Sequence, residues 1–455
     1  MKTIINRFDL YRFERLVSKL VKPSDLPAVA LIASCPEGLL FMAFCNGAML
    51  SYTVPTHSDT DPFTLPWQTL KELAQKKHDT IQFDVNGKDV TLSWNDNGIP
   101  QRKIVESSDL GDKRFPQKAE KTVAYSFKLF DAMIEAAKCV DDNSVRYALG
   151  AICLRGANNQ IISTDGRQAL IQDDYEFSFD NDVLCPVSRI FTSKELRELS
   201  ETVKLGVKDD WVYFNVGCVN FWLQKIEGKY PQLDQFTKNI DGHSWLNVEP
   251  TDAVFVSERL DSLPGKNNGD NPVYVGLDKF TIAVRGYDTT MQTATELRLE
   301  ESSFSGANVV MCLNRKFLKN ALGFGITRLG FDPKDTTPII GYGDKKTFII
   351  MPLEGKEPEI NPGKLTVLVS SAKTPKAVKA NKPTPATQVS RNTKPQAKAK
   401  PKSKVSVLDD AMKLRLSLRT TLGDVNSLIQ SIKSQRRYDK LLRDTVNSLR
   451  KLQNV

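Results

Sequence analysis

Residues 1–353 contain many short, mainly apolar runs, which we interpret as β-strands. β-Branched and aromatic residues dominate these runs. Asn86 and Gly87 separate two of the runs and predict a tight hairpin turn between them. We therefore expect antiparallel sheets of short strands. The predicted strands lie at 80–85, 90–94, 203–207, 211–216, 219–224, 326–331, 338–342 and 347–353.

Helix-like stretches precede these strand sets and recur along the chain. They cover residues 65–73, 187–199 and 313–323, so their starts are 122 and 126 positions apart. Another helix with strands lies ahead of each one, at 8–55, 124–173 and 252–298. The segment Arg114-Phe115-Pro116-Gln117 also recurs, as Lys229-Tyr230-Pro231-Gln232. Recurrence at a regular spacing indicates a repeated unit.

The repeats predict an α+β fold of three tandem domains. Each domain is expected to consist of two halves, in which a helix packs on an antiparallel sheet. We place the domains at residues 1–121, 122–246 and 247–355.

The pattern changes after Leu353. Between Ser371 and Lys404 there are ten Lys or Arg, five Pro and no acidic residue. Such a stretch buries too little apolar area to offset the entropy of ordering it, so we expect 356–405 to be a disordered linker. Residues 406–455 instead predict a helical hairpin or a coiled-coil segment. Apolar residues recur there at helical spacing, at Leu418, Leu422, Val425, Ile429 and Ile432.

Charge divides the chain into an acidic body and a basic extension. Residues 356–455 hold 22 Lys or Arg and 7 Asp or Glu, a net charge of +15. The other 355 residues hold 41 basic and 47 acidic side chains, a net charge of −6. The net charge of the whole chain, +9, therefore says little about the partner of the body.

Several classes of protein are disfavoured by the sequence. No apolar run is long enough to span a membrane, and the N-terminus lacks the apolar region of a signal peptide. The seven cysteines are dispersed and no histidine stands near one, which favours reduced thiols in the cytoplasm and no metal site. The motifs GxSxG, HExxH, the Walker loop and a helix-opening GxGxxG are absent, so we expect neither an enzyme nor a cofactor.

The first predicted helix carries a regular row of cations. Arg12, Arg15, Lys19 and Lys22 recur at a spacing of three or four, on one helix face and without regularly placed acidic residues. The row fits either an ordinary solvated helix or a surface that meets phosphates. Apolar residues recur at the same spacing on another face and suit packing on a sheet, namely Leu10, Phe13, Val17 and Leu20.

Four segments resemble the β sliding clamp of bacterial DNA polymerase III, over residues 1 to about 354. Arg146-Tyr147-Ala148-Leu149 is similar to the family's Arg-Tyr-x-Leu, and the segment that follows from Ser163 is similar to Ala-Thr-Asp-Gly-His-Arg-Leu. Glu227-Gly228-Lys229-Tyr230-Pro231-Gln232 resembles Glu-Gly-x-Phe-Pro-Asp, and Met351-Pro352-Leu353 resembles the closing Met-Pro-Met.

The resemblance implies a head-to-tail homodimer that forms a ring around double-stranded DNA. Contacts to phosphates carry no base information, so such a ring could slide. The family's DNA-contacting positions match Lys22, Arg146, Tyr147 and Arg189, and we expect DNA contacts there and along the row of Arg12, Arg15 and Lys19. The family's location would place the protein in the cytoplasm, at the nucleoid.

The resemblance also implies a pocket between the second and third domains for short peptides of DNA polymerase and clamp-loader subunits. Where the family has His-Arg-Leu, this chain has Arg167-Gln168-Ala169, so the preferred peptide is expected to differ. The matching pocket residues are Leu149, Thr164, Gly166, Arg167, Asn314, Phe317, Ile349, Met351, Pro352 and Leu353.

The basic extension is the largest departure from the family, whose chains usually stop after Met-Pro-Met. It leaves the rim of the expected pocket at Leu353, so we expect it to modulate the pocket or to add contacts to DNA or a partner. A second interpretation is a clamp-like scaffold or paralogue that binds DNA or partners mainly through this extension.

Overall fold

The computed structural model describes residues 2–56, 59–75, 80–110, 113–141, 147–237, 244–265, 270–332, 337–359 and 362–370. All of them lie within the first of two compact units, Met1–Lys376. Among these described residues, no helix combines the length and apolar character needed to cross a membrane.

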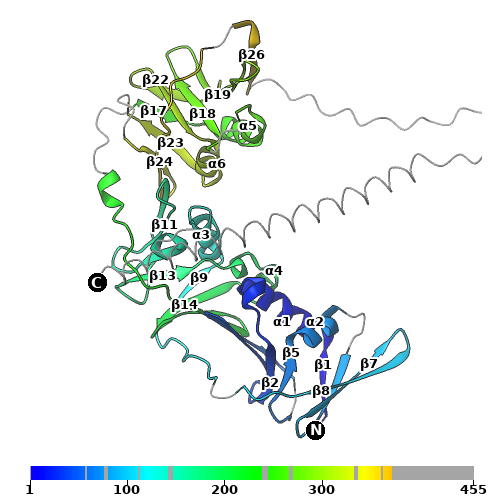
Figure 1. Cartoon of the computed structure of the whole chain (residues 1–455). Coiled ribbons are helices and arrows are strands. Elements are labelled where there is room, and N and C mark those ends of the chain that lie inside the picture. Colours follow the sequence, from blue (N-terminus) through cyan, green and yellow to red (C-terminus); the bar gives the residue numbers. More distant parts are fainter. Residues whose placement is uncertain are drawn as a thin grey trace, which may run out of the picture. The chain divides into compact units, whose positions relative to one another are not determined.

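One series of elements occurs three times in succession: a strand, a helix, four strands, a second helix and three strands (Figure 1). We call these series repeats 1, 2 and 3. Repeat 1 consists of β1 (Lys2–Asn6), α1 (Arg7–Leu20), β2 (Val29–Cys35), β3 (Gly38–Cys45), β4 (Ala48–Val54), β5 (Phe63–Pro66), α2 (Trp67–Gln75), β6 (Thr80–Asn86), β7 (Asp89–Asp96) and β8 (Ile99–Glu106).

Repeat 2 follows the same order but has a broken second helix. The predicted helix at 187–199 forms a 3₁₀ turn, η3, and a single α-helical turn, α4, because Ser193 between them has an extended backbone. The elements are β9 (Val123–Ser126), α3 (Lys128–Ala137), β10 (Ala151–Arg155), β11 (Gln160–Thr164), β12 (Gln168–Gln172), β13 (Asp182–Pro186), η3 (Arg189–Thr192), α4 (Lys194–Arg197), β14 (Thr202–Lys208), β15 (Trp211–Val216) and β16 (Val219–Gln224).

Repeat 3 adds one short strand, β21, directly after its fourth strand. The predicted domain border after residue 246 falls inside β17, which pairs with β23 and so opens this repeat. The elements are β17 (Ser244–Asn247), α5 (Pro250–Arg259), β18 (Pro272–Leu277), β19 (Ile282–Asp288), β20 (Thr293–Arg298), β21 (Ser303–Ser305), β22 (Val309–Asn314), α6 (Arg315–Gly323), β23 (Ile326–Phe331), β24 (Ile339–Gly343) and β25 (Lys346–Ile350).

Local sequence explains where the main helices begin. Asn6 caps α1, because its side-chain oxygen accepts a hydrogen bond from the backbone N–H of Phe8 at 2.8 Å. Asn314 caps α6 in the same way through Lys316. Pro250 occupies the first turn of α5, where its missing N–H costs nothing. Short 3₁₀ turns also occur at Pro23–Asp25, Tyr147–Gly150, Asp234–Thr237, Leu260–Ser262 and Pro362–Lys364.

Each repeat contributes two antiparallel sheets of four strands, to one of which repeat 3 adds β21 as a fifth strand. In repeat 1 one sheet has the order β1-β6-β7-β8, and the other has the order β5-β2-β3-β4. The helices pack on the sheets through apolar side chains, as the buried Leu10, Phe13 and Val17 of α1 do. The predicted α+β architecture with antiparallel sheets is therefore confirmed, and the predicted strand runs coincide with β6, β7, β14, β15, β16, β23, β24 and β25.

Neighbouring repeats are joined edge to edge through their sheets. β4 of repeat 1 pairs antiparallel with β16 of repeat 2, which gives one eight-stranded sheet. β12 of repeat 2 pairs antiparallel with β25 of repeat 3 in the same manner. In both cases the fourth strand of one repeat meets the last strand of the next repeat.

The extension begins with ordered structure, which corrects the prediction of a disordered linker from residue 356. Residues 365–369 form β26 (Leu365–Val369), which pairs parallel with β20 at the edge of the last sheet. Five apolar or β-branched residues suffice to form a strand where a free edge is offered. The helical segment predicted at 406–455 lies outside the described residues.

Candidate functional site

The cation row of α1 faces acidic side chains from repeat 2. Arg15 and Lys19 lie 3.7 Å and 2.7 Å from the carboxylate of Glu195, and Arg12 lies 3.5 Å from that of Glu198. Both carboxylates belong to α4 or the residue after it. The helix itself has no regularly placed acidic residues, and the partners of the row come from a segment distant in sequence.

Glu195 is held in its charged form at this contact. Burial, the largest influence, would raise its pKa, but hydrogen bonds from Lys19 and Ser193 outweigh it and bring the pKa to about 2. Arg12 is further fixed by Tyr52, which it contacts at 3.4 Å and which donates to Asp9 at 2.8 Å. The row thus joins repeats 1 and 2, and three of its four cations form ion pairs with repeat 2.

Arg189 and Ser188 continue the same contact at the end of α1. Arg189 donates to the carbonyls of Ser18 and Val21, at 3.1 and 3.5 Å, and Ser188 donates to that of Leu20 at 2.7 Å. These carbonyls belong to the last turn of the helix or the residue after it, where they have no partner within the helix. Arg189 therefore caps α1, and its exposed side chain retains a positive charge at the surface.

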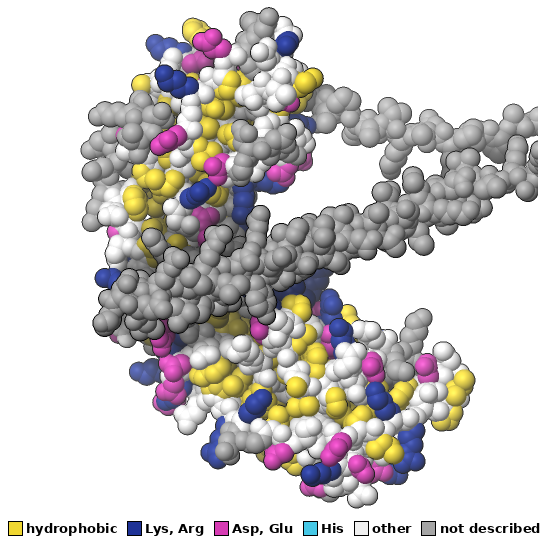
Figure 2. Space-filling view, viewed as in Figure 1, with side chains coloured by type: hydrophobic (Ala, Val, Ile, Leu, Met, Phe, Trp, Pro, Cys, Tyr) yellow, Lys and Arg dark blue, Asp and Glu magenta, His cyan; other side chains and the backbone are white. Residues whose placement is uncertain are grey.

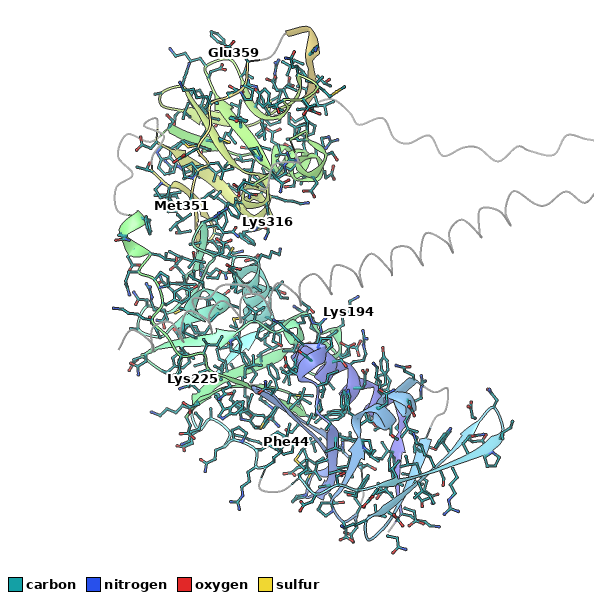
Figure 3. The ribbon with its side chains drawn as sticks, viewed as in Figure 1. Phe44, Lys194, Lys225, Lys316, Met351 and Glu359 are labelled. Carbon is teal, nitrogen blue, oxygen red and sulfur yellow. The ribbon has the colours of Figure 1, made fainter. Side chains whose placement is uncertain are left out.

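Two exposed cations on this side have no ion-pair partner among the described residues, Lys22 after α1 and Lys194 at the start of α4. Figure 3 labels Lys194 at this place, and Figure 2 shows Lys and Arg mixed with Asp and Glu in the described surface. The predicted DNA contacts at Arg146 and at the side chain of Tyr147 lie outside the described residues.

The predicted peptide pocket is built around the joint of β12 and β25. The turn before β12 is shaped by Gly166, whose positive φ of 86° suits glycine, and by Thr164, which accepts a hydrogen bond from the Gly166 N–H at 3.0 Å. A side chain at Gly166 would come within 3.9 Å of Leu149. Asp165 and Gly166 therefore form the turn that leads into β12.

The segment after β25 forms the second wall. The N–H of Met351 donates to the carbonyl of Arg167 at 2.8 Å, and the N–H of Leu353 donates to that of Cys312 at 2.8 Å. Met351 is 37% exposed, Pro352 and Leu353 are half-buried, and Ile349 is buried opposite Ala169. Figure 3 labels Met351 just beyond β25. These residues form an apolar surface bordered by backbone polar groups.

Arg167, Asn314 and Phe317 have other partners in the structure. Arg167 forms an exposed ion pair with Asp270 at 2.8 Å, which links repeat 2 to repeat 3. Asn314 caps α6, and Phe317 is buried in the core of repeat 3. Phe317 therefore supports the helix from within, and its side chain is not on the exposed wall.

Tyr230 and Leu233 are as buried as Phe317, at 4% and 5% exposed, so they support the joint from within. Both are buried against Ala169 and Ile349 in one apolar cluster beside the joint of β12 and β25. Asp234 anchors the same segment through Arg155 at 3.1 Å. The recurring Tyr230-Pro231-Gln232 motif marked this segment, but only as a loop.

No group of three or more His, Cys, Asp or Glu side chains in the described ranges is placed to hold a metal ion. The seven cysteines are all free thiols.

Comparisons with known proteins agree with this architecture. No protein-family model and no curated protein sequence matches the chain. Solved structures do match: the DNA polymerase III subunit beta from Pseudomonas aeruginosa has a TM-score of 0.66 at 14% identity, covering 78% of this chain and 100% of that one. The beta subunit from Streptococcus pyogenes has a TM-score of 0.66 at 13% identity, with the same coverage.

A third match is a sliding clamp from Pseudomonas aeruginosa bound to griselimycin, with a TM-score of 0.65 at 15% identity, covering 78% of this chain and 99% of that one. The solved structures similar to this chain are DNA polymerase III beta sliding clamps. The chain has the fold of the DNA polymerase III β sliding clamp.

Proposed function

We propose that this protein is a DNA sliding clamp: two copies close head to tail into a ring around double-stranded DNA. The ring tethers a DNA polymerase and other replication factors and catalyses no reaction itself. The observation that carries the proposal is the edge-to-edge joining of the repeats. β4 meets β16 and β12 meets β25, so a second copy can extend the same pattern from β20 to its own β8.

Partner recognition is proposed at the joint of repeats 2 and 3. The exposed Met351 and the half-buried Leu353 stand beside the polar turn at Gly166 and Arg167. An apolar wall with polar groups at its edge suits a short peptide that inserts one or two apolar side chains. We propose that polymerase and clamp-loader subunits bind there, in the cytoplasm at the nucleoid.

Contact with DNA is proposed for Lys22, Arg146, Tyr147 and Arg189, with Arg12, Arg15 and Lys19 holding repeats 1 and 2 together. A ring held by topology needs few phosphate contacts, because it cannot leave the duplex sideways. This division of roles fits the ion pairs of α1 with Glu195 and Glu198.

The proposal is tested by loading the full chain onto a nicked circular plasmid with its own clamp loader and ATP. We expect the protein to stay on the circle during gel filtration and to be lost when a restriction enzyme linearises the plasmid. The matched variant Ile104→Pro, in the exposed edge strand β8, should fail to stay on the circle. Equal retention on circular and linear DNA would contradict a ring.

A scaffold that binds DNA through its extension is the second candidate, favoured by the net charge of +15 in residues 356–455 and by the paired cations of α1. In that case the protein would stay monomeric in the loading experiment, and removal of residues 377–455 would abolish its affinity for DNA.

A further inference from the structure

The two internal joints define which strand edges should meet between copies of the chain. In each joint the fourth strand of a repeat pairs with the last strand of the next repeat. Only the fourth strand of repeat 3, β20, and the last strand of repeat 1, β8, lack such a joint within the described part of the chain. If the protein forms the proposed ring, β20 of one copy therefore meets β8 of the other.

That edge of β20 is already occupied by the chain's own extension. β26 pairs with it in parallel, with Leu365–Val369 opposite Ala294–Arg298. β26 is five residues long, as are β12 and β25 at an internal joint, so it uses as much of the edge as a joint does. A backbone edge can pair with only one strand at a time, so β26 and the β8 of a second copy exclude each other.

The path of the chain before β26 crosses the outer face of the same sheet, strand by strand. The N–H of Leu353 donates a hydrogen bond to β22. Further along, the carbonyl of Lys356 accepts a hydrogen bond from the hydroxyl of Tyr274 on β18 at 3.2 Å. Burial raises the pKa of Tyr274 to about 12, so its hydroxyl stays protonated and remains a donor. We call residues 353–359 the strap.

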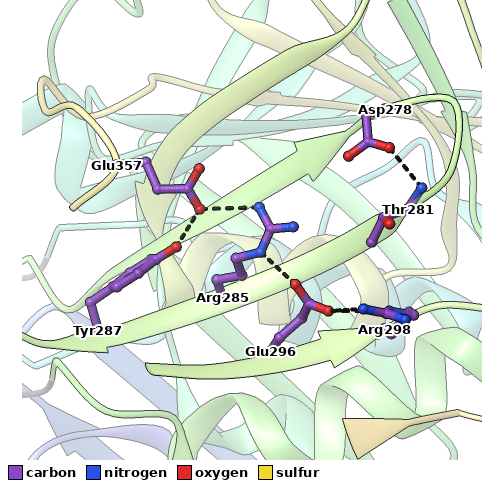
Figure 4. A network of polar contacts seen from close by, with 7 residues as sticks. All are labelled: Asp278, Thr281, Arg285, Tyr287, Glu296, Arg298 and Glu357. Atoms are coloured by element: carbon purple, nitrogen blue, oxygen red, sulfur yellow. Dashed lines mark hydrogen bonds and ion pairs between the residues drawn. The ribbon is translucent and has the colours of Figure 1, made fainter. Parts of the chain in front are cut away.

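Glu357 is the main polar anchor of the strap. Its carboxylate lies 3.1 Å from Arg285 on β19 and also accepts a hydrogen bond from Tyr287. Arg285 is held in turn by Glu296 on β20 at 2.7 Å (Figure 4). The strap therefore leads the chain from the end of β25 across the sheet to its edge at β20.

β26 is held less firmly than the strands of the internal joints. Its residues Leu365, Val367 and Leu368 are 36%, 39% and 41% exposed, whereas Leu50 and Phe221 at the joint of β4 and β16 are fully buried. A parallel pair is also slightly less stable per residue than an antiparallel one. Of the two strands that can occupy β20, only β8 would restore the antiparallel geometry of the other joints.

We propose that β20 is a shared strand edge, covered by β26 in the free chain and taken by β8 of a second copy when the ring closes. The inference rests on the proposed ring. In this arrangement the extension sets the affinity of the dimer, because closing the interface requires the release of β26. The exposed Ile99 and Ile104 of β8 are the apolar groups that the new joint would cover.

The first test weakens β26 in the full chain with Val367→Pro, which removes a strand N–H and restricts the backbone. The matched control is Val378→Pro, the same exchange in the basic stretch after β26. Sedimentation equilibrium should show at least a tenfold lower dimer Kd for Val367→Pro, about 1.4 kcal/mol, and no change for Val378→Pro. A Kd for Val367→Pro that is unchanged or higher would overturn the proposal, and a higher one would mean that β8 pairs with β26 itself.

The second test locks β26 in place. Thr295 and Thr366 are register partners on β20 and β26, and adjacent strands bring their Cα atoms within the range of a disulfide. Oxidised Thr295→Cys/Thr366→Cys protein should be monomeric and fail to load on circular DNA, and a reductant should restore both properties. Dimerisation of the oxidised protein would contradict competition at this edge.

The outcomes separate the two proposals. If the wild-type protein stays on circular DNA and neither β26 variant changes dimerisation, the ring stands and the competition falls. Val367→Pro could instead expose the β20 amides to hydrogen exchange while the protein remains monomeric and is not retained on circular DNA. In that case both the ring and the competition at β20 are wrong.

Discussion

Two of the strand edges that pair with a distant part of the chain are built in different ways. At the joint of β4 and β16 the strands are antiparallel, and the paired Leu50 and Phe221 are fully buried. At the joint of β20 and β26 the strands are parallel, and four of the five residues of β26 are exposed by more than a third.

The difference separates a permanent joint from an exchangeable one. Backbone hydrogen bonds are similar in both, and each contributes little net free energy because water competes for the same groups. Apolar burial, in contrast, contributes about 25 cal/mol per Å² and exists mainly at the first joint. The joint of β4 and β16 should therefore survive conditions that release β26.

The largest expected effect comes from breaking the permanent joint with Phe221→Ala. Phe221 is fully buried and stacks on Phe214 with ring centroids 4.7 Å apart. Its truncation leaves a cavity and should lower the free energy of unfolding by about 3–5 kcal/mol. Urea unfolding followed by circular dichroism measures the change.

The control for this prediction lies in the other joint. Leu368→Ala in β26 should change the free energy of unfolding by less than about 1 kcal/mol, because 41% of the residue is already exposed to water. A loss of several kcal/mol from Leu368→Ala would show that β26 is part of the permanent core.

A middle-sized effect concerns the contact of α1 with α4, which adds polar stabilisation to the joint of repeats 1 and 2. The pKa of Glu195 is lowered from 4.5 to about 2, so the stability it contributes is fully present above pH 4.5 and is lost as the pH falls toward 2. Glu195→Gln should lower the free energy of unfolding at pH 6 by about 1 kcal/mol. The difference between wild type and variant should shrink at pH 3.

Glu198→Gln is the matched control, since Glu198 is more exposed and its ion pair with Arg12 is longer, at 3.5 Å. Urea titrations of the three proteins at pH 6 and pH 3 are sufficient. If the difference in free energy of unfolding between wild type and Glu195→Gln grows at low pH, the assigned direction of the pKa shift of Glu195 is wrong.

The smallest effect concerns the strap. Glu357→Gln removes the charge that faces Arg285, and we expect hydrogen exchange at the amides of β20 and β26 to become about fivefold faster. Glu359→Gln, two residues on and labelled in Figure 3, is the control and should leave these rates unchanged. Equal exchange rates in all three proteins would mean that the strap does not hold β26.

Regular local patterns made much of the fold predictable. Runs of β-branched and aromatic residues located strands such as β15 and β16 to the residue, and the helical period located α1. Gly166 was recognisable as a turn residue, because a positive φ is costly for other residues. The resemblance of four sequence segments to the β sliding clamp pointed to the fold that the solved structures share.

The features that the sequence did not predict depend on contacts between distant segments. The cations of α1 stood without acidic partners on their own helix, and Glu195 lies more than 170 positions further along the chain. β26 was missed for another reason: Leu365-Thr366-Val367-Leu368-Val369 is a strand-like run, but the lysines and prolines around it dominated the composition. The run becomes a strand because repeat 3 offers it an edge, and no local pattern records that edge.

The place of β26 in the chain also has a consequence during synthesis. The strand is followed by residues 371–455, a segment longer than the ribosomal exit tunnel holds, so it has emerged before the chain is released. Domains fold as they emerge, N-terminal ones first. We therefore expect β20 to be covered while the chain is still on the ribosome, which keeps nascent neighbours on one messenger RNA from pairing through it.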